Sequence, residues 1–293
     1  MVSGLFQLTS AQIEEKTQSQ KLFGLEEIEK YLFNFCKSIL TAKEKDLSNF
    51  NLYDLKPSVL LYGPPNTGKT TLCHLLFKKI KKEVTNEINF YSVDVGRLLD
   101  PSLGQSSRNL GDIFDHLKSI CKKGSSVFLL LDELDAFCMS RSRTQEHDAI
   151  RRAMTTLMLE LDELRPTQDQ NILIFGITNV HELIDTAVVR RFSVKKSINA
   201  KLCPREFNNY LKYLSIPMKY NMGNKDIEKL YPIYRQKNFT IGDVKALYKE
   251  VYIDYLCHNL PRDHILERLN CLFNNGFSTE EHLLKTQKEL NKL

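Results

Sequence analysis

The chain has 293 residues, 42% of them hydrophobic and 26% charged, which is ordinary for a soluble globular protein with one or two domains. Its 41 basic and 36 acidic residues leave a net charge of only +5, a weak reason to expect a nucleic-acid partner. No stretch reaches the roughly 18 to 20 apolar residues that span a bilayer, and residues 1–20 lack a signal-peptide pattern. We therefore expect no membrane span and a cytoplasmic location.

The cysteines are odd in number, widely scattered and without the C-x-x-C spacing typical of metal sites. Most have apolar neighbours in the sequence, so we expect reduced thiols that act as small buried hydrophobic side chains. This expectation covers Cys36, Cys73, Cys121, Cys138, Cys203, Cys257 and Cys271.

In chain order, residues 1–20 are polar, and we expect a flexible segment there. Helical periodicity follows from Leu22 to about Leu40. Apolar segments with the character of strands then alternate with helical or polar segments, a pattern typical of a parallel sheet covered by helices on both faces. The five strands are expected at 59–62, 88–95, 127–132, 172–178 and 194–199.

From residue 201 the strand pattern stops, and amphipathic helices take over. We therefore predict an α/β fold in which a large domain with a five-stranded parallel sheet, residues 21–200, precedes a small all-helical domain, residues 201–293. The helices of the second domain are expected at 204–214, 226–231, 241–256, 262–273 and 279–293.

The most informative segment, residues 63–70, lies between a predicted strand and a predicted helix. Its spacing G-x-x-x-x-G-K-[ST] is typical of a phosphate-binding loop, in which backbone N–H groups surround the phosphates of a nucleotide. We expect Lys69 to reach the outer phosphates and the Thr70 hydroxyl to bind Mg²⁺; a chance match in a turn is the alternative. The predicted contacts are Gly63, Pro64, Pro65, Asn66, Thr67, Gly68, Lys69, Thr70 and Thr71.

Polar side chains also follow two of the predicted strands. Asp132 and Glu133 end one of them, and because side chains along a strand alternate between faces, we expect Asp132 to orient Mg²⁺ and Glu133 to polarise the attacking water. A solvated acidic loop is the alternative. Asn179 follows the strand 172–178 and is expected near the γ-phosphate, with an Asx-turn that caps the next helix as the other interpretation.

Arg190 and Arg191 end a helical segment just before the last predicted strand. This position places them at the rim of the sheet, far from the phosphate loop of their own chain. An arginine inserted into a neighbouring subunit neutralises charge that develops on a transferred phosphoryl group, and we expect that role here. The alternative is a pair that only adds to surface solubility.

Together these residues resemble the AAA+ ATPases, and the resemblance runs from about residue 21 to about residue 256. It implies a P-loop NTPase domain with a helical lid, hydrolysis of ATP with Mg²⁺, and a ring, usually of six subunits, with arginines donated across each interface. The residues that carry it are Phe23 and Gly24 in the adenine segment, Lys69 and Thr70 in the first Walker motif, Asp132 and Glu133 in the second, Asn179 as sensor 1, Arg190 and Arg191 as arginine fingers, and Gly242 in the opening of the lid helix.

The resemblance also implies loops in a central pore that move with hydrolysis. The first pore loop contains Ser102, Leu103 and Gly104, and Ser102 stands where the family commonly has an aromatic residue. Only Leu103 remains as an apolar grip, so we expect brief or partial unfolding of a protein client rather than strong threading. The polar insert 140–147 is expected to be the second pore loop.

Within that family, the details are most similar to the remodellers of HORMA-domain proteins, on the segments 70–73, 148–151 and 178–185. This implies an ATP-driven homo-oligomer with a HORMA-like client, best placed in a bacterial signalling or defence system. Two alternatives stay open: an ATPase of the loader type that acts on nucleic acid, suggested by the net charge and the lysines in 78–82, and an unfoldase partner of a separate protease.

Overall fold

The computed structural model describes residues 3–84, 87–98, 105–135, 144–168, 171–180, 182, 184–199, 201–257, 261 and 264–275. The chain forms two compact units, Met1–Asn199 and Ala200–Leu293. This division lies one residue from the boundary expected between the α/β domain and the helical domain.

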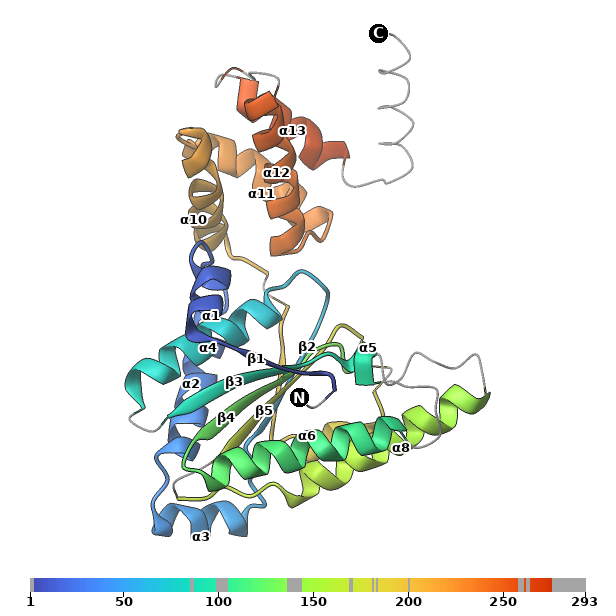
Figure 1. Cartoon of the computed structure of the whole chain (residues 1–293). Helices are drawn as coiled ribbons and strands as arrows, with labels where there is room; N and C mark the ends of the chain where they lie inside the picture. The colour runs from blue at the N-terminus through green and yellow to red at the C-terminus, as the bar shows by residue number, and fades with distance from the viewer. Residues whose placement is uncertain are drawn as a thin grey trace. The chain divides into compact units, whose positions relative to one another are not determined.

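The first unit is built on a six-stranded sheet with the strand order β1-β3-β4-β5-β2-β6 (Figure 1). Five strands are parallel and overlap the five predicted segments, whereas β1 pairs antiparallel with β3 at one edge. The predicted α/β fold is therefore confirmed, with one strand more than expected. The strands are β1 (Leu5–Leu8), β2 (Ser58–Tyr62), β3 (Ile88–Val93), β4 (Ser126–Leu131), β5 (Ile172–Thr178) and β6 (Val194–Ser197).

The N-terminal segment differs from the flexible segment that we expected. After β1, the helix α1 (Ser10–Thr17) begins with a capping box, in which Thr9 and Gln12 satisfy each other's backbone N–H groups at 3.2 and 2.9 Å. Ile13 of this helix is buried. A helix of two turns is too short to be identified from periodicity, and the pairing of β1 depends on a strand far along the chain.

Helices cover both faces of the sheet, with α2 and α4 on one face and α6 and α8 on the other (Figure 1). Toward α4, Phe128 of β4 stacks between Phe90 and Phe175, with ring centroids 5.2 and 4.5 Å away, and meets Phe77 edge-on. Leu129 of the same strand belongs to the opposite core beneath α6 and α8. Burial of both faces explains the nearly continuous apolar sequence of the central strands. Besides α1, the helices are α2 (Glu26–Leu40), α3 (Glu44–Leu52), α4 (Lys69–Glu83), α5 (Val95–Leu98), α6 (Gln105–Lys122), α8 (Thr144–Glu163) and α9 (Thr186–Arg191).

In the second unit, every element that the structure describes is a helix. Its packing includes a hydrogen bond from the backbone N–H of Leu202 to the hydroxyl of Tyr234 at 3.1 Å, and one from the hydroxyl of Tyr210 to the carbonyl of Ile241 at 2.9 Å. The helices are α10 (Pro204–Ser215), the short 3-10 helix η2 (Ile216–Met218), α11 (Asn224–Gln236), α12 (Ile241–Cys257) and α13 (Ile265–Asn275); the helix expected at 279–293 lies outside the described residues.

Among the described residues of both units, no helix has the length and apolar character that a membrane span requires.

The cysteines only partly follow the expectation that they are buried. The described cysteines of the first unit pack inside it, whereas those of the second unit are exposed. Cys36, Cys73 and Cys121 are buried, Cys203, Cys257 and Cys271 are exposed, and Cys138 lies outside the described residues.

Substitution of a core glycine tests the packing of the sheet against its surroundings. A Cβ atom at Gly176 of β5 would lie 2.5 Å from Cδ1 of Leu134 and 3.0 Å from Cζ of Phe192, both buried. We expect Gly176→Ala to lower the free energy of unfolding by about 1 to 3 kcal/mol, measured by urea denaturation. As the control, Gly111→Ala in α6 meets no atom within 4 Å and should stabilise the helix by up to about 1 kcal/mol. Equal stability of the two variants would contradict this account.

Candidate nucleotide-binding site

The loop between β2 and α4 requires glycine at two positions. Gly63 has a φ of +139°, and a Cβ atom there would lie 2.5 Å from the carbonyl oxygen of Ile198. Gly68 has a φ of +90° and immediately precedes α4, while Asn66 between them is also left-handed, with a φ of +60°. The loop thus leads directly into the first turn of α4, whose free N–H groups and positive dipole end favour an anion.

Lys69, the first residue of α4, is 5% exposed and points into this loop. Its ammonium donates hydrogen bonds to the carbonyl oxygens of Gly63 at 2.9 Å and Pro64 at 2.7 Å. Burial lowers the pKa of Lys69 to about 8, although the carboxylates of Asp132 and Asp135 oppose this shift. The ammonium therefore lies where it could bind phosphate oxygens, in a site that destabilises its charge until an anion compensates it.

The structure brings together Thr70 and Asp132, the two predicted ligands of Mg²⁺. The hydroxyl of Thr70 in α4 donates a hydrogen bond of 2.9 Å to Oδ2 of Asp132, the first residue after β4. Oxygen ligands from a hydroxyl and a carboxylate suit Mg²⁺, which usually keeps several waters and takes one or two carboxylates from a protein. The residues present therefore fit this ion.

The alternation expected along a strand does not apply to Asp132 and Glu133. Strand β4 ends at Leu131, so the alternation of side chains along a strand does not reach these two residues. Instead, Glu133 has a φ of +56°, a left-handed conformation that costs on the order of 1 to 3 kcal/mol for a residue with a Cβ atom. Its N–H donates to Oδ1 of Asp132 at 2.9 Å, and the next N–H, of Leu134, donates to the carbonyl of Ile177 at 2.9 Å. These bonds hold the turn, and the Glu133 side chain is exposed.

Asp135 is a residue of this site that the sequence analysis missed. Its side chain is 8% exposed, and Oδ1 accepts hydrogen bonds from the Thr178 hydroxyl at 3.0 Å and from the Asn179 backbone N–H at 3.2 Å. It therefore fixes the end of β5, where Asn179 was expected to face the nucleotide. The available signal was a third acidic residue in an otherwise apolar segment, since a buried carboxylate needs partners.

The predicted adenine segment lies beside the loop. Phe23 is 5% exposed, and Gly24 has a φ of +68° just before α2. A Cβ atom at Gly68 would lie 3.9 Å from the side chains of both Leu22 and Leu25, so this segment contacts the second half of the phosphate loop.

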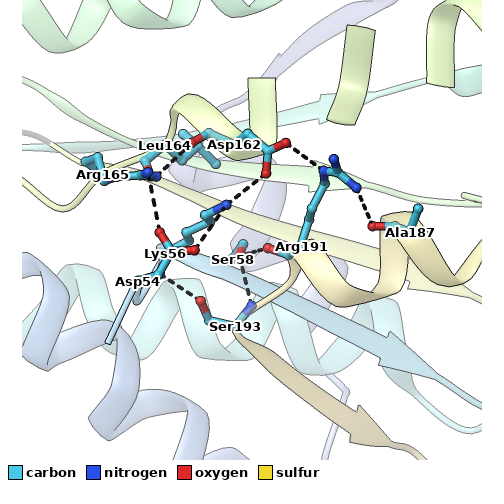
Figure 2. Close-up of polar contacts among 9 residues, drawn as sticks. All are labelled: Asp54, Lys56, Ser58, Asp162, Leu164, Arg165, Ala187, Arg191 and Ser193. Carbon is cyan, nitrogen blue, oxygen red and sulfur yellow. Dashed lines mark hydrogen bonds and ion pairs between the residues drawn. The ribbon is translucent and has the colours of Figure 1, made fainter. Parts of the chain in front are cut away.

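The two arginines differ from each other in the structure. Arg190 is exposed, whereas Arg191 donates hydrogen bonds from Nε to Oδ2 of Asp162 and from Nη1 to the carbonyl of Ala187, both at 2.8 Å (Figure 2). The hydroxyl of Ser58, the first residue of β2, donates to the carbonyl of Arg191 at 3.4 Å. Arg191 thus lies at the amino end of β2, and the phosphate loop begins at its carboxyl end, roughly 15 Å away for a strand of this length.

The remaining predicted residues lie in the loop, in α4, in the second unit or outside the described residues. Thr67 donates to the carbonyl of Pro64 at 2.9 Å inside the loop, and Pro65 and Thr71 lie in the loop and in α4. Gly242 belongs to α12 of the second unit. Ser102, Leu103, Gly104 and residues 140–143 lie outside the described residues, and residues 144–147 form the start of α8.

Residues 59–200 match the model of the ATPase family associated with various cellular activities (AAA). Among characterised proteins, the chain is 26% identical over 229 residues to the human pachytene checkpoint protein 2 homolog, which covers 75% of this chain and 50% of that protein. It is 32% identical over 152 residues to an AAA ATPase forming ring-shaped complexes from Corynebacterium diphtheriae, which covers 50% of this chain and 30% of that protein. The chain therefore spans about half the length of the human relative.

Two solved structures have the same fold. One is a chain of the Escherichia coli MS115-1 HORMA:CdnC:Trip13 complex, with a TM-score of 0.73, 19% identity, and coverage of 91% of this chain and 93% of that one. The other is Caenorhabditis elegans PCH-2, with a TM-score of 0.70, 18% identity, and coverage of 94% and 76%. These TM-scores show that the three chains share a fold.

The lowered pKa of Lys69 gives a prediction for the pH dependence of binding. Phosphate binds the charged ammonium, and above pH 8 a growing share of the free protein must take up a proton in order to bind. We expect the affinity for ATP, measured by isothermal titration calorimetry, to fall about tenfold between pH 7 and pH 9. In Lys69→Met, which has no ammonium, binding should be weak at both values and lack this slope. An unchanged affinity of the wild type across the range would contradict the proposed contact.

Proposed function

We propose that this chain hydrolyses ATP with Mg²⁺ and uses the energy to remodel a protein client, because residues 59–200 match the AAA ATPase family model. The observation that carries the first part is the contact between Thr70 and Asp132, beside the ammonium of Lys69 at the start of α4. The Lys69 ammonium and the Thr70 hydroxyl of α4 thus come together with the Asp132 carboxylate that follows β4. These three groups have the chemistry of a site for phosphate and magnesium.

In the proposed reaction, the loop N–H groups and Lys69 bind and orient the phosphates. Thr70 and Asp132 would hold Mg²⁺, which would supply neutralisation of charge on the transferred group. Glu133 accepts hydrogen bonds from the attacking water and so polarises it. Asn179, fixed through Asp135, orients that water or the γ-phosphate. An arginine from a neighbouring copy then completes the site, because Arg191 lies at the opposite end of β2 from the loop.

Glu133→Gln tests the hydrolytic step. The amide keeps the size of the side chain and leaves the Thr70–Asp132 contact in place, but it is a poor acceptor for a proton. We expect ATP turnover, measured as the release of phosphate, to fall at least 100-fold, while the affinity for ATP changes by less than about threefold. Lys69→Ala should instead lose affinity, since it lacks the ammonium. Near-normal turnover in Glu133→Gln would remove Glu133 from this role.

For the client, we propose a protein with a HORMA domain. The support is the similarity to pachytene checkpoint protein 2 homologs and the shared fold with a chain of a complex that also contains a HORMA protein. A homo-oligomeric ring, of six subunits by the family resemblance, and a place in bacterial signalling or defence belong to the same proposal. The relative named as a ring-forming ATPase supports the assembly.

A client that is engaged by the pore loops should stimulate hydrolysis. We expect a HORMA-domain protein that has closed around its own peptide segment to raise ATP turnover of the wild type about five- to tenfold, at the low end of typical coupling energies. Leu103→Ala should remove this stimulation and keep the basal rate. A coupled phosphate assay with and without client measures both. If the client still stimulates hydrolysis in Leu103→Ala, Leu103 is not the residue that engages the client.

The alternative of a nucleic-acid client rests on the net charge and on the lysines of α4, two of which form ion pairs. Of the lysines that suggested it, Lys78 pairs with Glu14 at 2.8 Å and Lys79 with Glu29 at 3.3 Å. Lys81 donates to the Ser10 hydroxyl at 2.6 Å. The two ion pairs neutralise Lys78 and Lys79, whereas the Ser10 hydroxyl leaves the charge of Lys81 in place, so less charge remains for a phosphate backbone than the sequence suggested. The neighbouring genes would distinguish the third alternative, a partner of a separate protease.

A further inference from the structure

Arg191 is held within its own chain by Asp162, which is part of a larger cluster of charges at the amino end of β2 (Figure 2). Asp162 lies near the end of α8 and has two cationic partners: Nε of Arg191 at 2.8 Å from Oδ2, and Nζ of Lys56 at 3.0 Å from Oδ1. Each oxygen of one carboxylate thus serves a different cation.

The two cations differ in how freely they can move. The Lys56 side chain is 7% exposed, and its backbone N–H donates to the Ser193 hydroxyl at 2.7 Å, so Lys56 is tied to the segment that leads into β6. Arg191 is the last residue of the short helix α9, and its side chain is 30% exposed. Lys56 is therefore the fixed partner of Asp162, and Arg191 is the partner that can turn away.

The second cation decides what happens to the charges when Arg191 leaves. When one partner of a simple, partly buried ion pair is removed, the other charge is left uncompensated, and this destabilises the protein. Here Asp162 keeps Lys56, and the remaining pair has no net charge. Burial would raise the pKa of Asp162, but hydrogen bonds from Arg191 and Lys56 outweigh it and lower the pKa, so the carboxylate stays ionised. Lys56 also has a second carboxylate nearby, since its Nζ lies 3.7 Å from Oδ2 of Asp54. Nη2 of Arg165 lies 3.4 Å from Oδ1 of Asp54.

We propose that Asp162 and Lys56 are positioning residues that set how readily Arg191 leaves its own chain for the nucleotide of a neighbouring copy. Asp162 holds the guanidinium in place, and Lys56 neutralises that carboxylate after Arg191 has turned to the neighbour's phosphates. This inference rests on the proposed function, because it gives Arg191 a second partner in the assembled ring.

The exchange predicts opposite effects for the two partners of one ion pair. Asp162→Asn removes the charge that competes for Arg191, so the arginine becomes more available. Lys56→Met removes the cation that compensates Asp162, so the carboxylate holds Arg191 more strongly. A merely structural role of the pair predicts changes of the same sign, since either substitution breaks the same contact.

The test measures ATP-dependent assembly by sedimentation velocity, in the Glu133→Gln background so that hydrolysis does not interfere. We expect Asp162→Asn to lower the protein concentration at half-assembly by about five- to tenfold, and Lys56→Met to raise it by a similar factor, at the low end of typical coupling energies. Lys56→Arg, which keeps the charge, should behave like the parent. In Arg191→Ala, neither substitution should shift the midpoint further.

A neighbouring ion pair between α6 and α8 serves as the control. Lys118 of α6 lies 2.8 Å from Glu160 and 3.0 Å from Glu163 of α8, and Glu163 is next to Asp162 in the chain. Glu163→Gln and Lys118→Met break an equivalent surface pair without touching Arg191, and the midpoint should stay within about twofold of the parent. Thermal unfolding of every variant shows whether it folds.

Two outcomes would overturn the inference: shifts of the same sign in Asp162→Asn and Lys56→Met, or an assembly midpoint that depends on Arg190 and not on Arg191. The proposed function fails separately, if wild-type protein does not release phosphate from ATP at any concentration. Opposite shifts in assembly would support the exchange even then, because that measurement needs ATP binding and no hydrolysis.

Discussion

The hydrogen bond between Thr70 and Asp132 is the contact on which the candidate site depends. It joins α4, which follows β2, to the end of β4, and β5 lies between these two strands in the sheet. Parallel strands in neighbouring positions present their carboxyl ends at one edge, which is where open α/β sheets bind ligands. The order of the strands therefore assembles the loop, the acidic pair and Asn179 from segments that are more than 40 residues apart in the chain.

The direction of the sheet also separates two kinds of polar cluster. The carboxyl edge carries the loop, Asp132 and Asp135, while the amino end of β2 carries the cluster of Lys56, Asp162 and Arg191. A single copy cannot bring both to one nucleotide, because the length of a strand lies between them. In the proposed ring, a neighbouring copy supplies its Arg191 to the nucleotide bound at the carboxyl edge of the first copy. Each subunit thus contributes its carboxyl edge to one site and its amino edge to another.

The site contains local features that oppose stability and are offset by specific contacts. Lys69 is buried with its charge, and carbonyl oxygens of the loop accept its hydrogen bonds. Glu133 adopts a left-handed conformation, and hydrogen bonds through its own N–H and that of Leu134 hold the turn. Such strain persists where the surrounding structure determines it fully, and it is common at functional sites. A rigid arrangement of charges before the ligand arrives is what electrostatic catalysis requires.

Local patterns in the sequence are enough to predict the parallel strands, from their apolar runs, and a loop with the spacing typical of phosphate binding. Glycine is needed in that loop because positions such as Gly63 are left-handed and crowded. The pairing of β1 with β3, the turn at Glu133, the contacts of Asp135 beneath Asn179 and the pairing of Arg191 with Asp162 arise only in the folded chain. Each of these depends on a partner distant in the chain or on backbone angles of one residue, and neither leaves a periodic trace in the sequence.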